Sequence, residues 1–429
     1  MDAVTYRGLI YLNGQLTRGS IVVSGGLIKS IGGVEGVVID LPPSHFIMPP
    51  MADIHVHLRD LELSYKEDVE SGSAAALAGG VAALGNMPNT KPPIKTINLL
   101  KGIMDVIKAK SRLRVRQYFG APEDVKVLKE AYANGAWAVG EVFPEEVAEY
   151  GGDDYLEALF REASRVGIPI IMHCEDPVVI SQYSGPRDFK YHGEVRGPRA
   201  ELACVANVIK LTYRYGARIH LTHITLPQSI QLVKSSGLNI TIDATPHHML
   251  LSQEECLSRV EVPGYCKVNP PLRSREVREG LLRAFIGGLV DIVASDHAPH
   301  AQWEKERPYD EAPPGIVGLE TTLPLMLTLW VRGFVDLETI VKAINERPMR
   351  FLGFEPGLKV GQRADFVIVG LGKSIIDPSR FRSKAKFTPF KGFEVDALVA
   401  ATVLNGELAY VNTDDEPLEN ALRQAGLLK

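Results

Sequence analysis

Apolar residues follow one rhythm at the two ends of the chain and another in the middle. At both ends, short strand-like runs are separated by glycine-containing turns, and Asn405-Gly406 is a strong hairpin signal. These runs cover residues 6–12, 20–23 and 27–31 at the start, and 365–369, 399–404 and 408–411 near the end. We therefore predict that residues 1–48 and 356–429 fold together into one small β-sandwich domain.

Between the ends, residues 49–355 alternate strand-like apolar runs with helix-like stretches. The strand-like runs cover residues 46–56, 81–87, 113–118, 136–143, 168–172, 218–221, 240–244 and 291–294. Eight strands alternating with helices are typical of a (β/α)8 TIM-like barrel. A doubly wound α/β sheet is the alternative. The barrel is favoured because polar residues follow nearly every run, where a barrel carries its active site, and because no glycine-rich dinucleotide motif follows the first strand.

Composition and charge narrow the class of protein. Of the 429 residues, 45% are hydrophobic and 23% charged, as in a packed soluble enzyme, and the formal net charge is −5. No run of positive charge is present, so a nucleic-acid partner is not expected. The most lipid-like stretch, residues 72–85, is shorter than the ~20 apolar residues of a membrane span. The first residues lack the features of a signal peptide. We expect a cytoplasmic protein without a membrane partner.

The four cysteines predict neither a disulfide framework nor a cysteine zinc site. Cys174, Cys204, Cys256 and Cys266 form no C-x-x-C pair.

Histidines at strand ends indicate a metal site. His55 and His57 are two residues apart on the first barrel strand, so their side chains share one side. His173, His223 and Asp296 follow the fifth, sixth and eighth strands. A lone His-x-His is weak evidence, and a single strand-end histidine is usually a surface residue. Four histidines and one aspartate at the same end of one barrel instead predict zinc, which imidazole and carboxylate ligands suit.

The remaining histidines receive other interpretations. His220 and His223 are three apart on a strand and face opposite sides, so only one can enter the barrel mouth, and His223 lies nearer the strand end. We interpret His220, His45 and His192 as structural or surface residues.

Seven motifs occur in order along nearly the whole chain. They are DIHVHLRD (53–60), NMPNT (86–90), HCED (173–176), TPHH (245–248), NPPLR (269–273), SDHAPH (295–300) and PGIVGLE (314–320), followed by SK (383–384) and FTPFKG (387–392). With these motifs the sequence resembles the amidohydrolase superfamily, and within it the dihydroorotases (class I-like).

The resemblance implies a hydrolase acting on carbon–nitrogen bonds of cyclic amides. The reaction that the resemblance implies is the reversible, zinc-dependent cyclisation of N-carbamoyl-L-aspartate to L-dihydroorotate in de novo pyrimidine (UMP) biosynthesis. It also implies that Asp296 is both a zinc ligand and the catalytic proton carrier, since a carboxylate can accept a proton from water and pass it to the leaving nitrogen. The TPHH histidines, His247 and His248, are not ligands in this family, and we assign them structural roles.

The same resemblance implies a binding site for the substrate carboxylate. Arg59 lies two residues beyond His57, and a guanidinium pairs well with a carboxylate, although a surface ion pair is the alternative. Asn269 is expected to contact the ring amides, or else to serve as a turn residue before Pro270. The polar, proline-rich segment 300–315 is either a plain surface loop or a loop that closes over substrate. The predicted substrate-binding residues are Arg59, Asn89, Asn269, His300, Pro314 and Gly315.

One position departs from the pattern of the superfamily. Many members bridge two metal ions with a carbamylated lysine on the fourth strand, but here Trp137 stands at that position and no lysine occurs between Lys129 and Lys190. A bacterial branch of the family has an aspartate four positions later, which corresponds to Glu141. We predict that Glu141 bridges two zinc ions. The alternative is a surface acid beside a site with one zinc.

Two other functions remain open from the sequence. A hydantoinase, dihydropyrimidinase or allantoinase would share the superfamily but mostly uses the lysine that is missing here. A catalytically silent scaffold protein would have lost metal ligands, whereas this chain keeps them. The resemblance also suggests a homodimer and an association with aspartate carbamoyltransferase. Metal content together with turnover of carbamoyl-aspartate would separate these readings.

Overall fold

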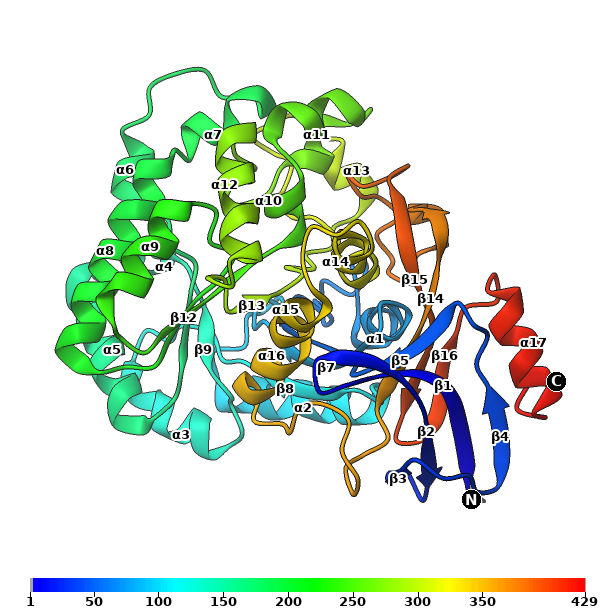
Figure 1. Cartoon of the computed structure of the whole chain (residues 1–429). Helices are drawn as coiled ribbons and strands as arrows, with labels where there is room; N and C mark the ends of the chain where they lie inside the picture. The colour runs from blue at the N-terminus through cyan, green and yellow to red at the C-terminus, as the bar shows by residue number, and fades with distance from the viewer. Residues whose placement is uncertain (1–2, 429) are drawn as a thin grey trace.

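Eight parallel strands form a closed barrel in the computed structural model, which describes residues 3–428 (Figure 1). Neighbouring strands pair in chain order, Phe119 pairs with Val139 to join β8 to β9, and Val56 pairs with His297 to close the ring. The predicted TIM-like barrel is therefore confirmed. Its strands are β6 (Met51–Val56), β7 (Val81–Asn86), β8 (Arg114–Gln117), β9 (Val139–Val142), β10 (Ile170–Met172), β11 (Ile219–Leu221), β12 (Ile240–Ala244) and β13 (Ile292–Val293).

Helices follow the strands and cover the outside of the barrel (Figure 1). The longer ones are α1 (Val69–Ala78), α2 (Ile97–Lys110), α5 (Asp153–Val166), α8 (Pro198–Tyr215), α9 (Pro227–Ser236), α12 (Arg275–Ile286) and α14 (Thr322–Val331). Shorter helices are α3 (Leu128–Ala133), α4 (Pro144–Glu149), α6 (Pro177–Ser181), α7 (His192–Val195), α10 (Pro246–Leu250), α11 (Gln253–Arg259), α13 (Gln302–Lys305), α15 (Leu337–Val341) and α16 (Arg347–Phe351).

Helix α5 shows why these sequences form covering helices. Its first turn carries Asp153 and Asp154, whose charges favour the amino end of a helix. Leu156, Leu159 and Phe160 are buried at a spacing that places them on one face. The helix ends at Gly167, which has a φ of +82° that a glycine adopts without steric cost.

The predicted first strand, residues 46–56, is two strands in the structure. β5 (His45–Met48) pairs with the strands of the chain ends, and β6 begins the barrel. Pro49 and Pro50 separate them, and proline cannot donate a hydrogen bond to a ladder. The prediction of one continuous strand is therefore wrong, although β6 still carries His55 at its carboxyl end.

Strands from both chain ends share one eight-stranded sheet beside the barrel, on the side where both termini lie (Figure 1). Its central seam is the antiparallel pair of β5 and β14, and Asn405 and Gly406 form the turn between β15 and β16 with positive φ angles. The sheet contains β1 (Val4–Leu12), β2 (Gln15–Ser24), β3 (Leu27–Ile31), β4 (Val37–Asp40), β5, β14 (Phe366–Ile375), β15 (Glu394–Leu404) and β16 (Glu407–Val411), and α17 (Glu416–Gln424) follows it.

The exact boundaries of the composite domain, 48/49 and 355/356, stay a prediction. Its outermost residues, 1, 2 and 429, lie outside the described part of the chain. Among residues 3–428, no helix combines the length and the apolar character that crossing a membrane requires.

Two disulfides join the four cysteines, so the expectation of no disulfide framework is wrong. Cys174 follows β10 and bonds Cys204 of α8, 30 residues away, and Cys256 of α11 bonds Cys266, 10 residues away. Neither spacing matches a local cysteine motif. The pairs form because the fold packs these segments against one another, which spacing rules do not detect.

Candidate active site

The six predicted ligand side chains come together, buried, at the carboxyl end of the barrel. His55 lies on β6 and Glu141 on β9, while His57, His173, His223 and Asp296 lie just beyond their strands. Donor atoms of five of them form two groups of three whose members all lie within 4.8 Å of one another, namely His55, His57 and Asp296, and His55, Glu141 and His223. His173 belongs to neither group and reaches the cluster through Glu141, whose Oε1 lies 3.0 Å from its Nδ1.

The first group has the donor chemistry of a cation site. Oδ1 of Asp296 lies 3.2 Å from Nε2 of His55 and 3.2 Å from Nε2 of His57. The two Nε2 atoms are themselves 3.2 Å apart. Unprotonated ring nitrogens that face each other repel, and a shared cation removes that repulsion. Two imidazoles and a carboxylate are a donor set that zinc accepts.

Glu141 connects this group to the other two histidines. Its Oε1 lies 2.7 Å from Nε2 of His223 and 3.0 Å from Nδ1 of His173. Its Oε2 lies 3.4 Å from Nε2 of His55. One oxygen of the carboxylate therefore faces each half of the cluster, as a bridging ligand must.

Electrostatics keep both carboxylates ionised. Burial raises the pKa of Glu141, but the charges of His55 and His223 lower it well below its usual value. Burial also raises the pKa of Asp296, but the charge of His55, the hydrogen bond with His57 and the charge of His223 lower it below its usual value. Conversely, burial lowers the pKa of His55, yet Asp296 and Glu141 raise it to about 9. The two ionised carboxylates thus stabilise positive charge within the cluster.

Neighbouring residues fix the orientation of the histidine rings. Nδ1 of His57 donates to Oδ1 of Asn89 at 2.7 Å, which leaves its Nε2 lone pair for a metal. Nε2 of His173 donates to Oε2 of Glu175 at 2.8 Å, and Arg196 donates to the same oxygen at 2.7 Å. The sequence reading did not assign this role to Glu175, although its position two residues after His173 in the HCED motif is a signal.

Asp243, at the end of β12, is a second residue that the sequence reading missed. Its Oδ1 accepts from the backbone N–H of His223 at 2.6 Å. Its Oδ2 accepts from Oγ1 of Thr222 at 2.8 Å, and Thr222 in turn accepts from Nδ1 of His55 at 2.5 Å. His220 also donates to Asp243, at 2.7 Å. One buried carboxylate therefore holds ligands of both halves of the cluster.

A cavity of about 230 Å³ adjoins the cluster. Its volume suits a small molecule rather than a polymer. All six predicted substrate-binding residues line it, together with ligands from the cluster. The lining residues are His57, Arg59, Asn89, Glu141, Phe143, His223, Val268, Asn269, Asp296, Ala298, His300, Pro314 and Gly315.

Arg59 brings a buried positive charge to this cavity. The residue is only 7% exposed, and its backbone φ is +55°. Its Nε donates to the carbonyl of Pro299 at 3.3 Å, and Nη2 lies 3.3 Å from Nε2 of His300. Burial lowers the pKa of Arg59 to about 10, so it stays protonated at neutral pH. No carboxylate of residues 3–428 lies within 4 Å of it, so its charge is available to an anionic ligand.

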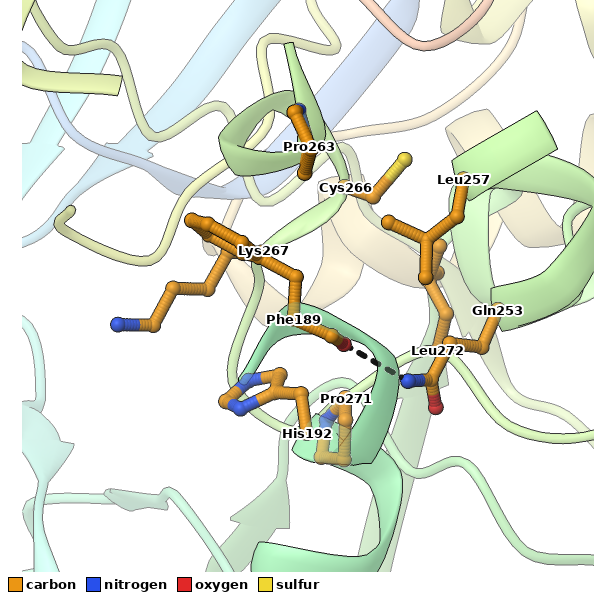
Figure 2. A pocket seen from close by; sticks show the side chains of 9 residues that line it. All are labelled: Phe189, His192, Gln253, Leu257, Pro263, Cys266, Lys267, Pro271 and Leu272. Atoms are coloured by element: carbon orange, nitrogen blue, oxygen red, sulfur yellow. Dashed lines mark hydrogen bonds between the residues drawn. The ribbon is translucent and has the colours of Figure 1, made fainter. Parts of the chain in front are cut away.

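Asn269 contacts His192. His192 also lines a small neighbouring cavity (Figure 2). Nε2 of His192 donates to Oδ1 of Asn269 at 3.0 Å and lies 3.0 Å from the carbonyl of Val268. Its Nδ1 lies 2.8 Å from the hydroxyl of Tyr309. Because Oδ1 of Asn269 is occupied, its amide nitrogen is the group left to donate to a ligand.

The other predicted structural histidines lie outside the two donor groups. His248 donates from Nε2 to the carbonyl of Pro270 at 2.8 Å and contacts Oγ1 of Thr245 through Nδ1 at 2.8 Å. His247 is buried beside it, and its Nε2 has no hydrogen-bond partner. His45 bonds Asp415 at 2.8 Å, on the sheet of the chain ends.

Trp137 does not lie at the histidine and carboxylate cluster, although its alignment with the bridging lysine would place it there. Its Nε1 donates to the carbonyl of Phe351 at 2.9 Å, and Arg116 lies over its ring at 4.1 Å. It packs with Ile54 and Ile171 inside the amino end of the barrel. Glu141, four residues later on β9, is the residue that reaches the cluster.

Comparisons with known proteins agree with this geometry. Residues 46–409 match the model of the amidohydrolase family. Two similar curated proteins are dihydroorotases. The one from Pyrobaculum aerophilum is 37% identical over 96% of this chain and 98% of its own. The one from Anoxybacillus flavithermus is 32% identical over 94% of this chain and 96% of its own. Among solved structures, an L-hydantoinase (dihydropyrimidinase) from Arthrobacter aurescens superimposes with a TM-score of 0.88 at 25% identity, covering 96% of this chain and 98% of its own.

Proposed function

The chain belongs to the amidohydrolase family, with dihydroorotases among its relatives, and on that premise we propose that it is a dihydroorotase. It interconverts N-carbamoyl-L-aspartate and L-dihydroorotate, a step of de novo pyrimidine biosynthesis. The observation that carries the proposal is the buried, unpaired charge of Arg59 in the same cavity as the carboxylate and histidine cluster. Both substrates bear a carboxylate that does not react, and Arg59 is placed to bind it.

The donor set fits zinc, and two ions suit it better than one. His55, His57 and Asp296 would hold one ion and His173 and His223 the other, with Glu141 shared between them. When bound, zinc supplies Lewis-acid activation of water and of the amide carbonyl. A shared anion is expected because two neighbouring dications repel each other.

Asp296 moves the proton in this proposal. It lines the substrate cavity, and its low pKa keeps it ionised and able to accept a proton from the attacking water. In the hydrolytic direction it then delivers that proton to the ring nitrogen that leaves, and in the cyclising direction the transfers reverse. Arg59, Asn89, Asn269 and His300 bind the polar groups of the substrate, while Pro314 and Gly315 form the wall behind it.

The experiment offers three rings to the purified protein and measures metal content in parallel. We expect turnover of L-dihydroorotate and N-carbamoyl-L-aspartate, and little or none of hydantoin or dihydrouracil, which lack the carboxylate. Removal of the metal with a chelator should abolish turnover, and zinc should restore it. Preference for hydantoin or dihydrouracil would make the protein a hydantoinase or dihydropyrimidinase. Bound zinc with no turnover of any ring would indicate a catalytically silent scaffold.

Location and assembly belong to the same proposal. A dihydroorotase acts on cytoplasmic intermediates, and the resemblance suggests a homodimer that associates with aspartate carbamoyltransferase. Light scattering of the protein alone, and then mixed with that enzyme, tests both states. A monomer whose mass does not change on mixing would contradict both.

A further inference from the structure

Lys305 is a fully buried lysine just behind the substrate cavity. It ends the short helix α13 and has an exposed fraction of 0%. A lysine in the polar, proline-rich segment 300–315 reads in the sequence as a surface residue. Burial of an ammonium is costly unless other groups replace its hydration, so its surroundings call for explanation.

Three backbone carbonyls replace the hydration of this ammonium. Nζ of Lys305 donates to the carbonyl oxygens of Lys267 at 3.0 Å, Pro313 at 2.8 Å and Gly315 at 2.8 Å. A protonated amine has three N–H donors, and all three are used here. A neutral amine has only two N–H donors, so its lone pair would face the lone pairs of the third oxygen and be repelled by them. The geometry therefore requires the charged form, although burial and the charge of Lys267 lower its pKa.

The charge of Lys305 is hydrogen-bonded but not neutralised. Within residues 3–428, no carboxylate lies within 4 Å of its Nζ. Its field reaches the substrate cavity, where it lowers the pKa of His300 together with burial and the charge of Arg59. An uncompensated buried cation beside a binding site favours anionic ligands.

The three carbonyls belong to the two segments that form one wall of the cavity. Lys267 precedes Val268 and Asn269, and Pro313 and Gly315 flank Pro314. The backbone N–H of Gly315 also donates to the carbonyl of Lys267, at 2.9 Å, so the ammonium reinforces a direct contact between the segments. Without the ammonium, the carbonyls of Pro313 and Gly315 would lose this donor, and the hydrogen bond from Gly315 to Lys267 would be left to hold the two segments together.

We propose that Lys305 is a positioning and specificity residue, which fixes the wall formed by Val268, Asn269, Pro314 and Gly315 and adds positive potential for an anionic substrate. This inference rests on the proposed function. It acts through substrate binding rather than through the metal cluster, because none of its three hydrogen bonds reaches a metal ligand. The part of segment 300–315 that Lys305 holds is a fixed wall, so the two alternatives for this segment, a plain surface loop or a loop that closes over substrate, concern residues 306–311, which are exposed except for Tyr309.

Lys267 offers a matched control on the same segment. Its Nζ donates to the carbonyls of Tyr309 and Ala312, which do not line the cavity. Figure 2 shows its side chain reaching away from Leu257 and Gln253. Removal of the Lys267 ammonium therefore costs the segment two hydrogen bonds without loosening the wall directly.

The test compares Lys305→Met and Lys305→Gln with Lys267→Met. We expect Lys305→Met to raise KM for L-dihydroorotate and N-carbamoyl-L-aspartate at least tenfold, with kcat changed less than threefold and zinc content unchanged. Lys305→Gln, which keeps a donor but no charge, should lie between it and the wild type, and Lys267→Met should change KM less than threefold. If the methionine variant does not fold, ethylammonium should lower the raised KM of Lys305→Ala by refilling the site.

Three outcomes would overturn the inference. One is an unchanged KM in folded Lys305→Met. The second is a rise of KM in Lys267→Met that equals the rise in Lys305→Met. The third is a loss of both zinc and kcat in Lys305→Met. A wild-type protein that turns over neither substrate would overturn the proposed function instead, so the two failures are distinguishable.

Discussion

The two ends of the barrel are built from the same strands but differ in almost every property. At the amino end, Trp137, Ile54, Ile171 and Met349 pack into an apolar floor. At the carboxyl end, the continuations of the same strands carry four imidazoles and two ionised carboxylates in a buried cluster. Strand β9 shows the contrast within one short stretch, because Trp137 precedes it at the floor and Glu141 reaches the cluster. The position of a residue along the barrel axis, rather than the strand that carries it, therefore decides whether its side chain is apolar or ionisable.

Backbone conformation separates the two ends as well. Five of the seven described non-glycine residues with positive φ follow strands at the carboxyl mouth, namely Arg59, Asp60, Leu61, His223 and Asp296. A left-handed conformation costs an ordinary residue about 1–2 kcal/mol. Three of these five residues, Arg59, His223 and Asp296, line the cavity, so the left-handed conformation occurs where functional side chains are positioned. We therefore expect mutations at the mouth to affect chemistry and mutations at the floor to affect stability.

The largest effect is expected for Asp296→Asn. The amide keeps the size of the side chain but cannot accept a proton, so kcat should fall by about 10²–10⁴-fold. Steady-state kinetics measure the loss, and a thermal melt within a few degrees of the wild type shows that the fold is retained. Near-wild-type turnover would remove Asp296 from its proposed role.

Next comes Glu141→Gln, which tests the shared ligand and the absence of a carbamylated lysine. Loss of one negative charge between two cations should lower zinc content from two ions per chain to one or none, as measured by elemental analysis. Added bicarbonate should have no effect, since no lysine occupies the site. Glu145→Gln, at an exposed acid four residues later, is the matched control and should keep its zinc. Unchanged zinc and rate in Glu141→Gln would make Glu141 a bystander.

Arg59→Met should weaken the use of L-dihydroorotate by about 2–3 kcal/mol in kcat/KM, the range for a hydrogen bond to a charged group. A neutral ring without the carboxylate should be indifferent to the change. Arg307→Met, at an exposed arginine of the same mouth, serves as the control. Equal losses on charged and neutral rings would show that Arg59 is structural.

The smallest effect is expected at the floor, for Trp137→Phe. Loss of the indole hydrogen bond to Phe351 should lower the free energy of unfolding by about 1 kcal/mol, measured by urea denaturation. KM, kcat and zinc content should not change. A loss of zinc in this variant would mean that packing at the floor affects the metal ligands at the mouth. The expected separation of stability from chemistry would then be wrong.

Much of the fold was predictable because apolar periodicity is a local property. Each of the eight barrel strands lies within a predicted run, since a buried strand needs consecutive apolar residues whatever surrounds it. The prediction of one strand over residues 46–56 is wrong only at Pro49 and Pro50, which divide the run into β5 and β6. The strand-end motifs also predicted which side chains would meet, because the carboxyl ends of parallel barrel strands face one cavity. The structure brings those residues together, and their catalytic, ligand and substrate roles stay predictions.

Tertiary structure alone decided which groups the buried polar residues contact. Asp243, Glu175 and Lys305 are ordinary polar residues in the sequence, and only packing buries them and selects their partners. The same holds for the two disulfides, whose cysteines are joined by the contact of separate segments. The sequence by itself determined the strands, the barrel and the chemical types of the groups at its mouth. It did not determine hydrogen-bond partners or burial, because these depend on distances between residues that are far apart along the chain.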